Sequence, residues 1–149
     1  MLEVAVAGAA QAVKTHGVRY PAVLGVTVLT SIGKDEMNQQ LRVPGSVRSQ
    51  VRHLAAVSTR SGLDGIVCSA HEISAMRQHL PQGFLYVTPG IVMEKEAVPA
   101  GQARVATAGE AVKAGSSLVV AGRAVTGKCS REERQETAYK MLRDMAAYL

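Results

Sequence analysis

A glycine and an arginine, Gly122 and Arg123, follow the apolar run of residues 117–121 and are the clearest candidates for binding chemistry in this sequence. A glycine lets the main chain approach an anion closely, and an arginine can bind a phosphate through two parallel hydrogen bonds. A tight turn with a solvated arginine would use the same two residue types. The pair therefore indicates a phosphate site only if the surrounding elements bring other polar groups to it.

The same stretch is similar to a nucleotide-binding loop. Residues 122–129 read GRAVTGKC and match the pattern G-x-x-x-x-G-K-[ST] at every position but the last. There Cys129 replaces the hydroxyl residue that would bind Mg²⁺. Only about 20 residues follow, too few for the strand that supplies the second metal ligand in such enzymes. The next helix is expected to begin at Ser130. These features argue against a nucleoside triphosphatase.

Other catalytic and metal-binding patterns are missing from the sequence. The four histidines show neither a Ser/His/Asp order nor HExxH spacing, and the two cysteines form no metal-ligand pattern. Cys68 lies in an apolar run and is interpreted as a small core residue. Asp64 begins a predicted strand, at the end opposite the ligand face, and is interpreted as structural. We therefore expect no metal site and no catalytic residue of these classes.

Composition restricts the partners. The chain has 149 residues, a net charge of +5, 47% hydrophobic residues and 3% aromatic residues. Its basic residues are scattered and few aromatic residues could stack on bases, which argues against a nucleic-acid interface but allows a small phosphorylated ligand. The sequence has no apolar run of about 18 residues, which a membrane span would need. It also has no basic segment ahead of an apolar one, which a signal peptide would need. We expect a cytoplasmic protein.

The apolar pattern predicts one α/β domain over residues 1–149, with a helix at residues 2–15 followed by four strand–helix units. Three capping boxes indicate helix starts at Ser69, Thr107 and Ser130, and Ser46 begins another helix. Residues 30–44 are predicted to form a polar loop. This alternation favours a parallel sheet with right-handed crossovers, its strands buried on both faces. The predicted strands are residues 22–29, 64–68, 84–88 and 117–121.

Six segments, taken in order, resemble bacterial orotidine-5'-phosphate decarboxylase, the family that makes UMP. They are GVTVLTS (25–31), VPGSV (43–47), SGLDGIVCSAHE (61–72), FLYVTPGI (84–91), QARVATAGEAVKAG (102–115) and LVVAGRAVTG (118–127). The resemblance implies that the four strands are the fifth to eighth of a TIM (β/α)8 barrel, and that residues 2–15 are the helix after the fourth. The chain would then be the C-terminal half of the barrel.

The resemblance also implies roles for particular residues. Thr30 corresponds to a ligand-contacting threonine and Ser31 lies near the pyrimidine, while Gln102 matches a glutamine that closes on the phosphate. Together with the pair after the last strand, the implied substrate-binding residues are Thr30, Ser31, Pro89, Gly90, Gln102, Gly122 and Arg123. Two departures weaken this site: Val92 replaces the arginine that usually follows TPGI, and Gly101 replaces the aspartate before the glutamine.

The catalytic half of the family pattern is absent. The family uses alternating Asp and Lys residues, including a D-x-K-x-x-D motif on its second and third strands, and needs neither a metal nor an organic cofactor. None of the three aspartates here, Asp35, Asp64 and Asp144, begins such a motif. We expect a carboxy-lyase by family, converting orotidine 5'-phosphate to UMP and CO2, whose isolated chain is inactive.

Three hypotheses remain open. The chain is a fragment or truncated product of a decarboxylase, or a noncatalytic half-barrel that binds a phosphorylated ligand or pairs with a complementary chain. The third is a sugar-phosphate decarboxylase with the same barrel, although TVLTS and DGIVCS favour the pyrimidine enzyme. A half-barrel leaves open strand edges and an apolar inner face. We therefore expect a dimer, another homo-oligomer, or a complex with an N-terminal half.

Overall fold

A sheet of four parallel strands forms the centre of the protein. The computed structural model describes residues 1–93 and 104–149. Each strand pairs with the next along the chain, in the order β1-β2-β3-β4, which confirms the predicted topology. Every strand is shorter than its predicted range: the bounds are β1 Leu24–Val26, β2 Gly65–Val67, β3 Leu85–Thr88 and β4 Leu118–Val119.

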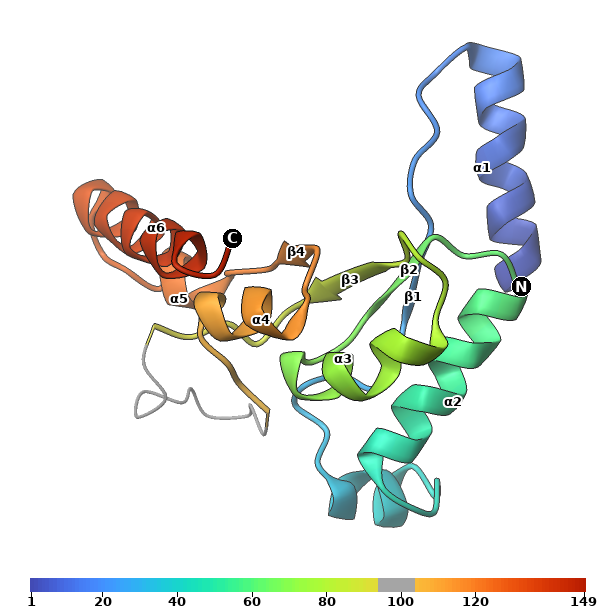
Figure 1. Cartoon of the computed structure of the whole chain (residues 1–149), viewed down its shortest axis with the longest axis horizontal. Coiled ribbons are helices and arrows are strands. Elements are labelled where there is room, and N and C mark those ends of the chain that lie inside the picture. The colour runs from blue at the N-terminus through green and yellow to red at the C-terminus, as the bar shows by residue number, and fades with distance from the viewer. Residues whose placement is uncertain (94–103) are drawn as a thin grey trace.

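Helices connect the strands and lie at both ends of the sheet. Figure 1 shows α1 and α2 beyond β1, and α5 and α6 beyond β4, with α3 and α4 between them. The α-helices are α1 Leu2–His16, α2 Val47–Arg60, α3 Ala70–Met76, α4 Ala108–Ala114, α5 Arg123–Thr126 and α6 Arg131–Ala146; the turns are η1 Glu36–Gln40 and η2 Arg77–His79. No helix within the described ranges is long and apolar enough to cross a membrane.

The helix starts follow the predicted capping residues. A serine or threonine side chain at the cap accepts a hydrogen bond from a main-chain N–H of the first turn. A glutamate three residues later accepts one from the main-chain N–H of the capping residue, so both N–H groups are hydrogen-bonded. Gly115 ends α4 in the left-handed conformation, with φ of 104°. The three capping boxes are Ser69/Glu72, Thr107/Glu110 and Ser130/Glu133, and Ser46 caps α2.

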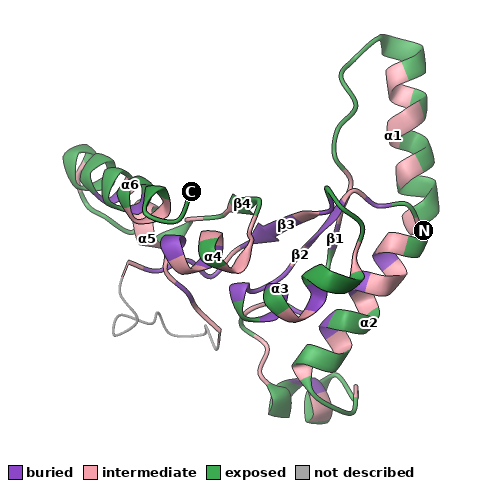
Figure 2. Ribbon diagram, in the orientation of Figure 1, coloured by how far each residue is buried: buried purple, intermediate pink, exposed green. Residues whose placement is uncertain are grey.

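The core lies on the helix-covered face of the sheet. Ile66 of β2 and Ile73 of α3 are fully buried, and the ring of Tyr86 meets that of Phe84 edge-on with centroids 5.9 Å apart. A second cluster packs α4 against α6 around Met141. Figure 2 shows that the buried residues gather in β2, β3 and the parts of the helices that face them, whereas α1 and α6 are largely exposed.

The other face of the sheet is open at the outer strands β1 and β4, so the prediction that the strands are buried on both faces is wrong for these two strands, whereas Tyr86, Val87 and Thr88 of β3 are all buried. Val26 is 60% exposed, Leu118 58% and Val120 48%. Side chains alternate between the faces of a strand, so these three project from the side that no described helix covers. The apolar run in the sequence correctly indicated a strand, but the elements that would cover its second face are not among the described residues.

The predicted loop of residues 30–44 contains a helical turn, which is a second difference. In η1, the amide of Met37 donates to the carbonyl of Gly33 at 3.0 Å, and the amide of Gly33 donates to the carboxylate of Glu36 at 2.9 Å. Met37 is only 1% exposed and joins the main core. A single apolar residue among polar neighbours creates no periodic pattern, which is why the sequence did not indicate this turn.

Candidate functional site

A pocket of about 230 Å³ lies at the carboxyl ends of the strands, where ligands bind in parallel α/β folds. It collects Thr30 and Ser31 from the end of β1, Pro89 from the end of β3, and Arg123 from the segment after β4. Four of the seven predicted binding residues therefore line one cavity. The remaining lining residues are Val26, Val28, Leu29, Val67 and Cys68.

The lining combines one cation, two hydroxyl groups and an apolar floor. None of the described residues that line the pocket is acidic. An arginine and hydroxyls can bind an anionic group through charge-assisted hydrogen bonds, while the apolar floor excludes water from the rest of a small ligand. The arrangement is suited to binding a small anion with an apolar body.

The two predicted glycines occupy different environments. Gly90 has φ of 76°, and a Cβ on it would lie 2.9 Å from the carbonyl oxygen of Arg104 and 3.4 Å from Cγ2 of Thr30. Its requirement for glycine thus comes from the protein's own packing. Gly122 has φ of −74°, and a Cβ there would meet no atom within 4 Å. Protein packing does not explain a glycine at Gly122.

The remaining positions of the family pattern are Val92, Gly101 and Gln102. Gln102 and Gly101 lie outside the described residues. Val92 is 3% exposed, and its amide donates to the carbonyl of Ala106 at 3.0 Å. Val92, which stands where the family usually has arginine, is therefore a core residue and does not line the pocket.

Cys68 lines the pocket as a neutral thiol. The pKa of Cys68 is raised to about 12, chiefly by burial and also by the negative charge of Glu72, while the positive charge of Arg104 acts in the opposite direction. A thiol with such a pKa is a poor nucleophile near neutral pH. The side chain therefore serves as an apolar wall, as predicted for a core residue.

The sequence did not point to Arg104, which makes a buried ion pair beside the pocket. Its Nη1 lies 2.7 Å from Oε1 of Glu72, and its Nη2 donates to the carbonyls of Val28 at 3.0 Å and Leu29 at 2.9 Å. Arg104 follows Gln102 by two positions in the segment QARVAT, but nothing in that segment identifies partners more than 30 residues away.

The polar residues that were interpreted as structural have structural partners. The carboxylate of Asp64 accepts a hydrogen bond from the amide of Val23 at 2.7 Å, at the amino end of the strands. A ring nitrogen of His71 lies 2.8 Å from the carbonyl oxygen of Val105 on an exposed surface. Among residues 1–93 and 104–149, no group of three His, Cys, Asp or Glu residues could hold a metal ion.

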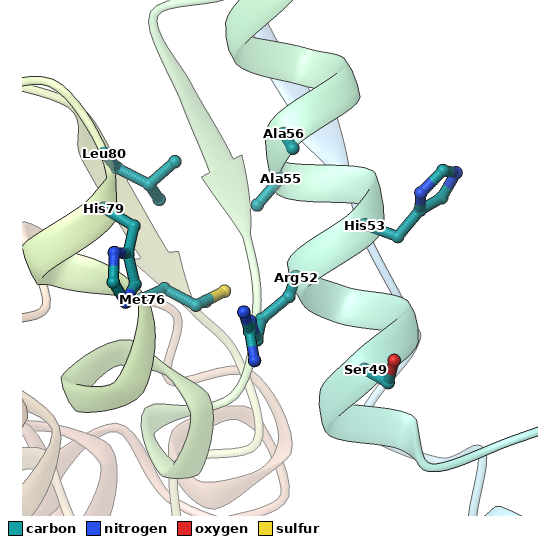
Figure 3. Close-up of a pocket in the computed structure, with 8 residues that line it drawn as sticks. All are labelled: Ser49, Arg52, His53, Ala55, Ala56, Met76, His79 and Leu80. Atoms are coloured by element: carbon teal, nitrogen blue, oxygen red, sulfur yellow. The ribbon is translucent and has the colours of Figure 1, made fainter.

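A second pocket, of about 360 Å³, lies between α2 and the segment of α3 and η2. In Figure 3, Arg52 points across the gap toward Met76, whereas His53 points away from it. This pocket contains none of the predicted binding residues and lies between helices, away from the strand ends. The candidate site is therefore the smaller pocket at the carboxyl ends.

Residues 2–138 match the sequence model of the "Orotidine 5'-phosphate decarboxylase / HUMPS family". The orotidine 5'-phosphate decarboxylase of Geobacillus sp. (strain WCH70) is 39% identical over 142 residues, which are 95% of this chain and 57% of the relative. That of Lysinibacillus sphaericus (strain C3-41) is 37% identical over 145 residues, which are 97% of this chain and 59% of the relative.

Solved structures that resemble this chain include a member of the same family. The crystal structure of orotidine 5'-phosphate decarboxylase from Lactobacillus acidophilus is similar with a TM-score of 0.71 and 30% sequence identity, covering 95% of this chain and 58% of that one. An uncharacterized conserved protein from Geobacillus kaustophilus gives a TM-score of 0.72 at 28% identity. This chain spans less than three fifths of the length of each of these proteins.

Proposed function

Because this chain belongs to the orotidine 5'-phosphate decarboxylase / HUMPS family, we propose that it supplies the phosphate-binding half of a barrel that converts orotidine 5'-phosphate to UMP and CO2. The main support is the pocket at the strand ends, which gathers Thr30, Ser31, Pro89 and Arg123. These four residues come from three separate segments of the sequence. Their common location is what a binding site for one small ligand requires.

The ligand's phosphate is bound by Arg123 together with the main chain at Gly122. The guanidinium offers paired donors that match phosphate oxygens, and the open space beside Gly122 leaves room for a phosphate against the main chain. Thr30 and Ser31 contact the nucleoside part of the ligand across the pocket. Pro89 completes the wall of the pocket.

The four strands are the fifth to eighth strands of a TIM (β/α)8 barrel. Two observations support this assignment: sequential parallel pairing and an apolar face left open on the side where a barrel interior lies. The relatives are longer by about two fifths of their length. The missing strands would cover Val26, Leu118 and Val120, which line the open face.

The reaction breaks the bond between C6 of the pyrimidine and the carboxylate, and the electron pair left on C6 takes a proton from a lysine ammonium. Neither a metal nor an organic cofactor takes part. The lysine and its paired aspartates belong to the D-x-K-x-x-D motif, which this sequence lacks. Asp64 accepts from the amide of Val23 and Asp144 from that of Gly109, both at 2.7 Å, so neither is free for this role. The isolated chain is therefore inactive.

A second candidate function is a noncatalytic half-barrel that binds a phosphorylated ligand or pairs with a complementary chain. The exposed apolar face favours this assembly, because large apolar patches and unpaired strand edges promote association. The partner is either a second copy of this chain or an N-terminal half-barrel. A monodisperse monomer in light scattering would contradict the proposed assembly.

Calorimetry with UMP tests the binding site. Arg123→Ala should weaken binding by about 1.5–3 kcal/mol, the scale of a charge-assisted hydrogen bond. Arg52→Ala, an exposed arginine on α2, is the matched control and should bind as the wild type does. Equal affinity of wild type and Arg123→Ala would remove the assignment. A sugar phosphate that binds more tightly than UMP would favour a sugar-phosphate substrate instead.

A mixing experiment tests the catalytic part of the proposal. The purified chain should show no decarboxylation of orotidine 5'-phosphate above background. Adding the N-terminal half of a relative, which carries the D-x-K-x-x-D motif, should restore turnover if the chain is half of a decarboxylase. Turnover by the chain alone would contradict the proposed inactivity. Binding of UMP without restored turnover would favour the noncatalytic half-barrel.

A further inference from the structure

Arg104 connects segments that are far apart in the sequence. Its side chain is 13% exposed, and that of its partner Glu72 is 5% exposed, so the ion pair is largely removed from water. The guanidinium contacts Glu72 through Nη1 and two successive main-chain carbonyls, of Val28 and Leu29, through Nη2. Nε is buried and has no hydrogen-bond partner among the described residues.

The partners of Arg104 are themselves part of the pocket or adjacent to it. Val28 and Leu29 line it and directly precede Thr30 and Ser31. The second carboxylate oxygen of Glu72 accepts a hydrogen bond from the amide of Ser69 at 3.0 Å. Ser69 directly follows Cys68, the residue that lines the pocket at the end of β2. One side chain thus joins the end of β1 to the start of α3.

The main chain of the same residue completes the arrangement at β3. The carbonyl oxygen of Arg104 is the atom that a Cβ on Gly90 would approach to 2.9 Å, and Gly90 also packs against Thr30. The amide of Ala106 donates to the carbonyl of Gly90 at 3.2 Å. Residues 104–106 therefore contact the segment after β1, the first turn of α3 and the end of β3.

We propose that Arg104 is a positioning residue: it fixes the turn after β1 so that Thr30 and Ser31 face the ligand. The amide of Ile32 closes this turn on the carbonyl of Leu29 at 2.9 Å, and Arg104 holds the same carbonyl together with the preceding one. Two neighbouring carbonyls directed at one donor leave the turn little freedom. Arg104 itself does not line the pocket.

Only an arginine can make this set of contacts. The planar guanidinium presents separate donors to the carboxylate and to the carbonyls at the same time, whereas a lysine ammonium is a single point on a flexible stem. Arg104→Lys keeps the positive charge opposite Glu72 but loses the separate donors that reach the carbonyls of Val28 and Leu29. Arg104→Met combined with Glu72→Gln removes both charges, and the glutamine oxygen can still accept the capping hydrogen bond from Ser69.

Amide hydrogen exchange of the full chain, measured by NMR, tests the positioning role without any ligand. In both Arg104 variants the Ile32 amide should exchange about tenfold faster than in the wild type, because local opening of the turn becomes easier. The amide of Leu85, which donates to the carbonyl of Asp64 at 2.9 Å within the sheet, should keep its rate. Arg52→Lys is the matched control and should change neither rate.

An unchanged Ile32 rate would overturn the proposal. Equal acceleration at Ile32 and Leu85 would also overturn it, because that result indicates general destabilisation and not a role at the turn. These outcomes do not depend on whether the chain binds a nucleotide.

The ligand readout rests on the proposed function and separates positioning from phosphate binding. Arg104→Lys should weaken UMP binding about fivefold, because Thr30 and Ser31 lose their fixed placement. Its affinity for inorganic phosphate, which needs only the site at Arg123, should stay unchanged. Equal loss of both ligands would overturn the positioning role. Absence of UMP binding by the wild type would refute the proposed function, while the exchange rates would still decide the role of Arg104.

Discussion

Replacing Gly122 with alanine adds a single methyl group beside the proposed phosphate. In the protein itself this methyl meets no atom within 4 Å, and φ of −74° is accessible to alanine. Gly→Ala at a compatible position stabilises a protein by about 0.4–1 kcal/mol through the unfolded state. The ψ of −99° lies outside the favoured helical range and reduces that gain. We expect the free energy of unfolding to change by less than about 1 kcal/mol.

Ligand binding should respond much more strongly to the same change. A methyl group between the main chain and the phosphate costs at least one charge-assisted hydrogen bond, about 1.5–3 kcal/mol. The UMP dissociation constant of Gly122→Ala should therefore rise about 10- to 150-fold. Titration calorimetry gives the affinity, and urea unfolding of the same samples gives the stability.

Gly8→Ala is the matched control for this experiment. Gly8 lies within α1, and a Cβ there also meets nothing within 4 Å. The substitution should stabilise the helix by up to about 1 kcal/mol and leave UMP binding unchanged. If Gly122→Ala and the wild type bind UMP with the same affinity, the main chain at Gly122 does not contact the phosphate.

Two further predictions concern stability and reactivity. Gly65→Ala places a Cβ against the carbonyl oxygen of Leu85, in the middle of the sheet, and should lower the free energy of unfolding by about 1–3 kcal/mol in urea titrations. An unchanged midpoint would contradict the packing of β2 on β3. At pH 8, iodoacetamide should label the exposed Cys129 and not Cys68, because a thiol with a pKa of about 12 is ionised in about one molecule in ten thousand. Equal labelling of the two cysteines in mass spectra of the folded protein would contradict the burial of Cys68.

The pKa of Cys68 also gives a direction for stability against pH. Its folded value of about 12 lies above the ordinary value of 9.0, so the unfolded chain ionises first. The contribution of the neutral thiol is complete below pH 9 and is lost progressively as the pH rises toward 12.

The elements that the sequence predicted well depend on neighbouring residues. A capping box such as Ser130 with Glu133 needs only four positions to satisfy the first turn of a helix, so its signal is present in the sequence. The strand order followed from the alternation of strands and helices, since each parallel strand needs a crossover to reach the next. The resemblance then indicated which strand ends carry the pocket.

The features that the sequence missed depend on distant partners. Arg104 is held by Glu72 and by carbonyls more than 70 positions earlier, and no local pattern records such a contact. Met37 is buried by elements that fold over it, although its neighbours are polar. The open face of Val26 was missed for a related reason, because apolar composition indicates a surface to be covered and not what covers it.

The pairing of every strand with its successor in the chain has a consequence for the order of folding. Leu24 pairs with Gly65, Gly65 with Leu85, and Val87 with Leu118, so the shortest chain segment closes β2 on β3. Closing a shorter loop costs less entropy, and sheets built from nearer contacts form faster. We expect β2 and β3 to pair first and the two outer strands to be added afterwards.

The pocket would then be the last part of the protein to form. Thr30 follows one outer strand and Arg123 follows the other, so a ligand in this pocket would bridge the two units that join the sheet late. A bound phosphate compound would then hold both flanks of the nascent sheet in place, and ligand availability during synthesis should raise the yield of folded chain.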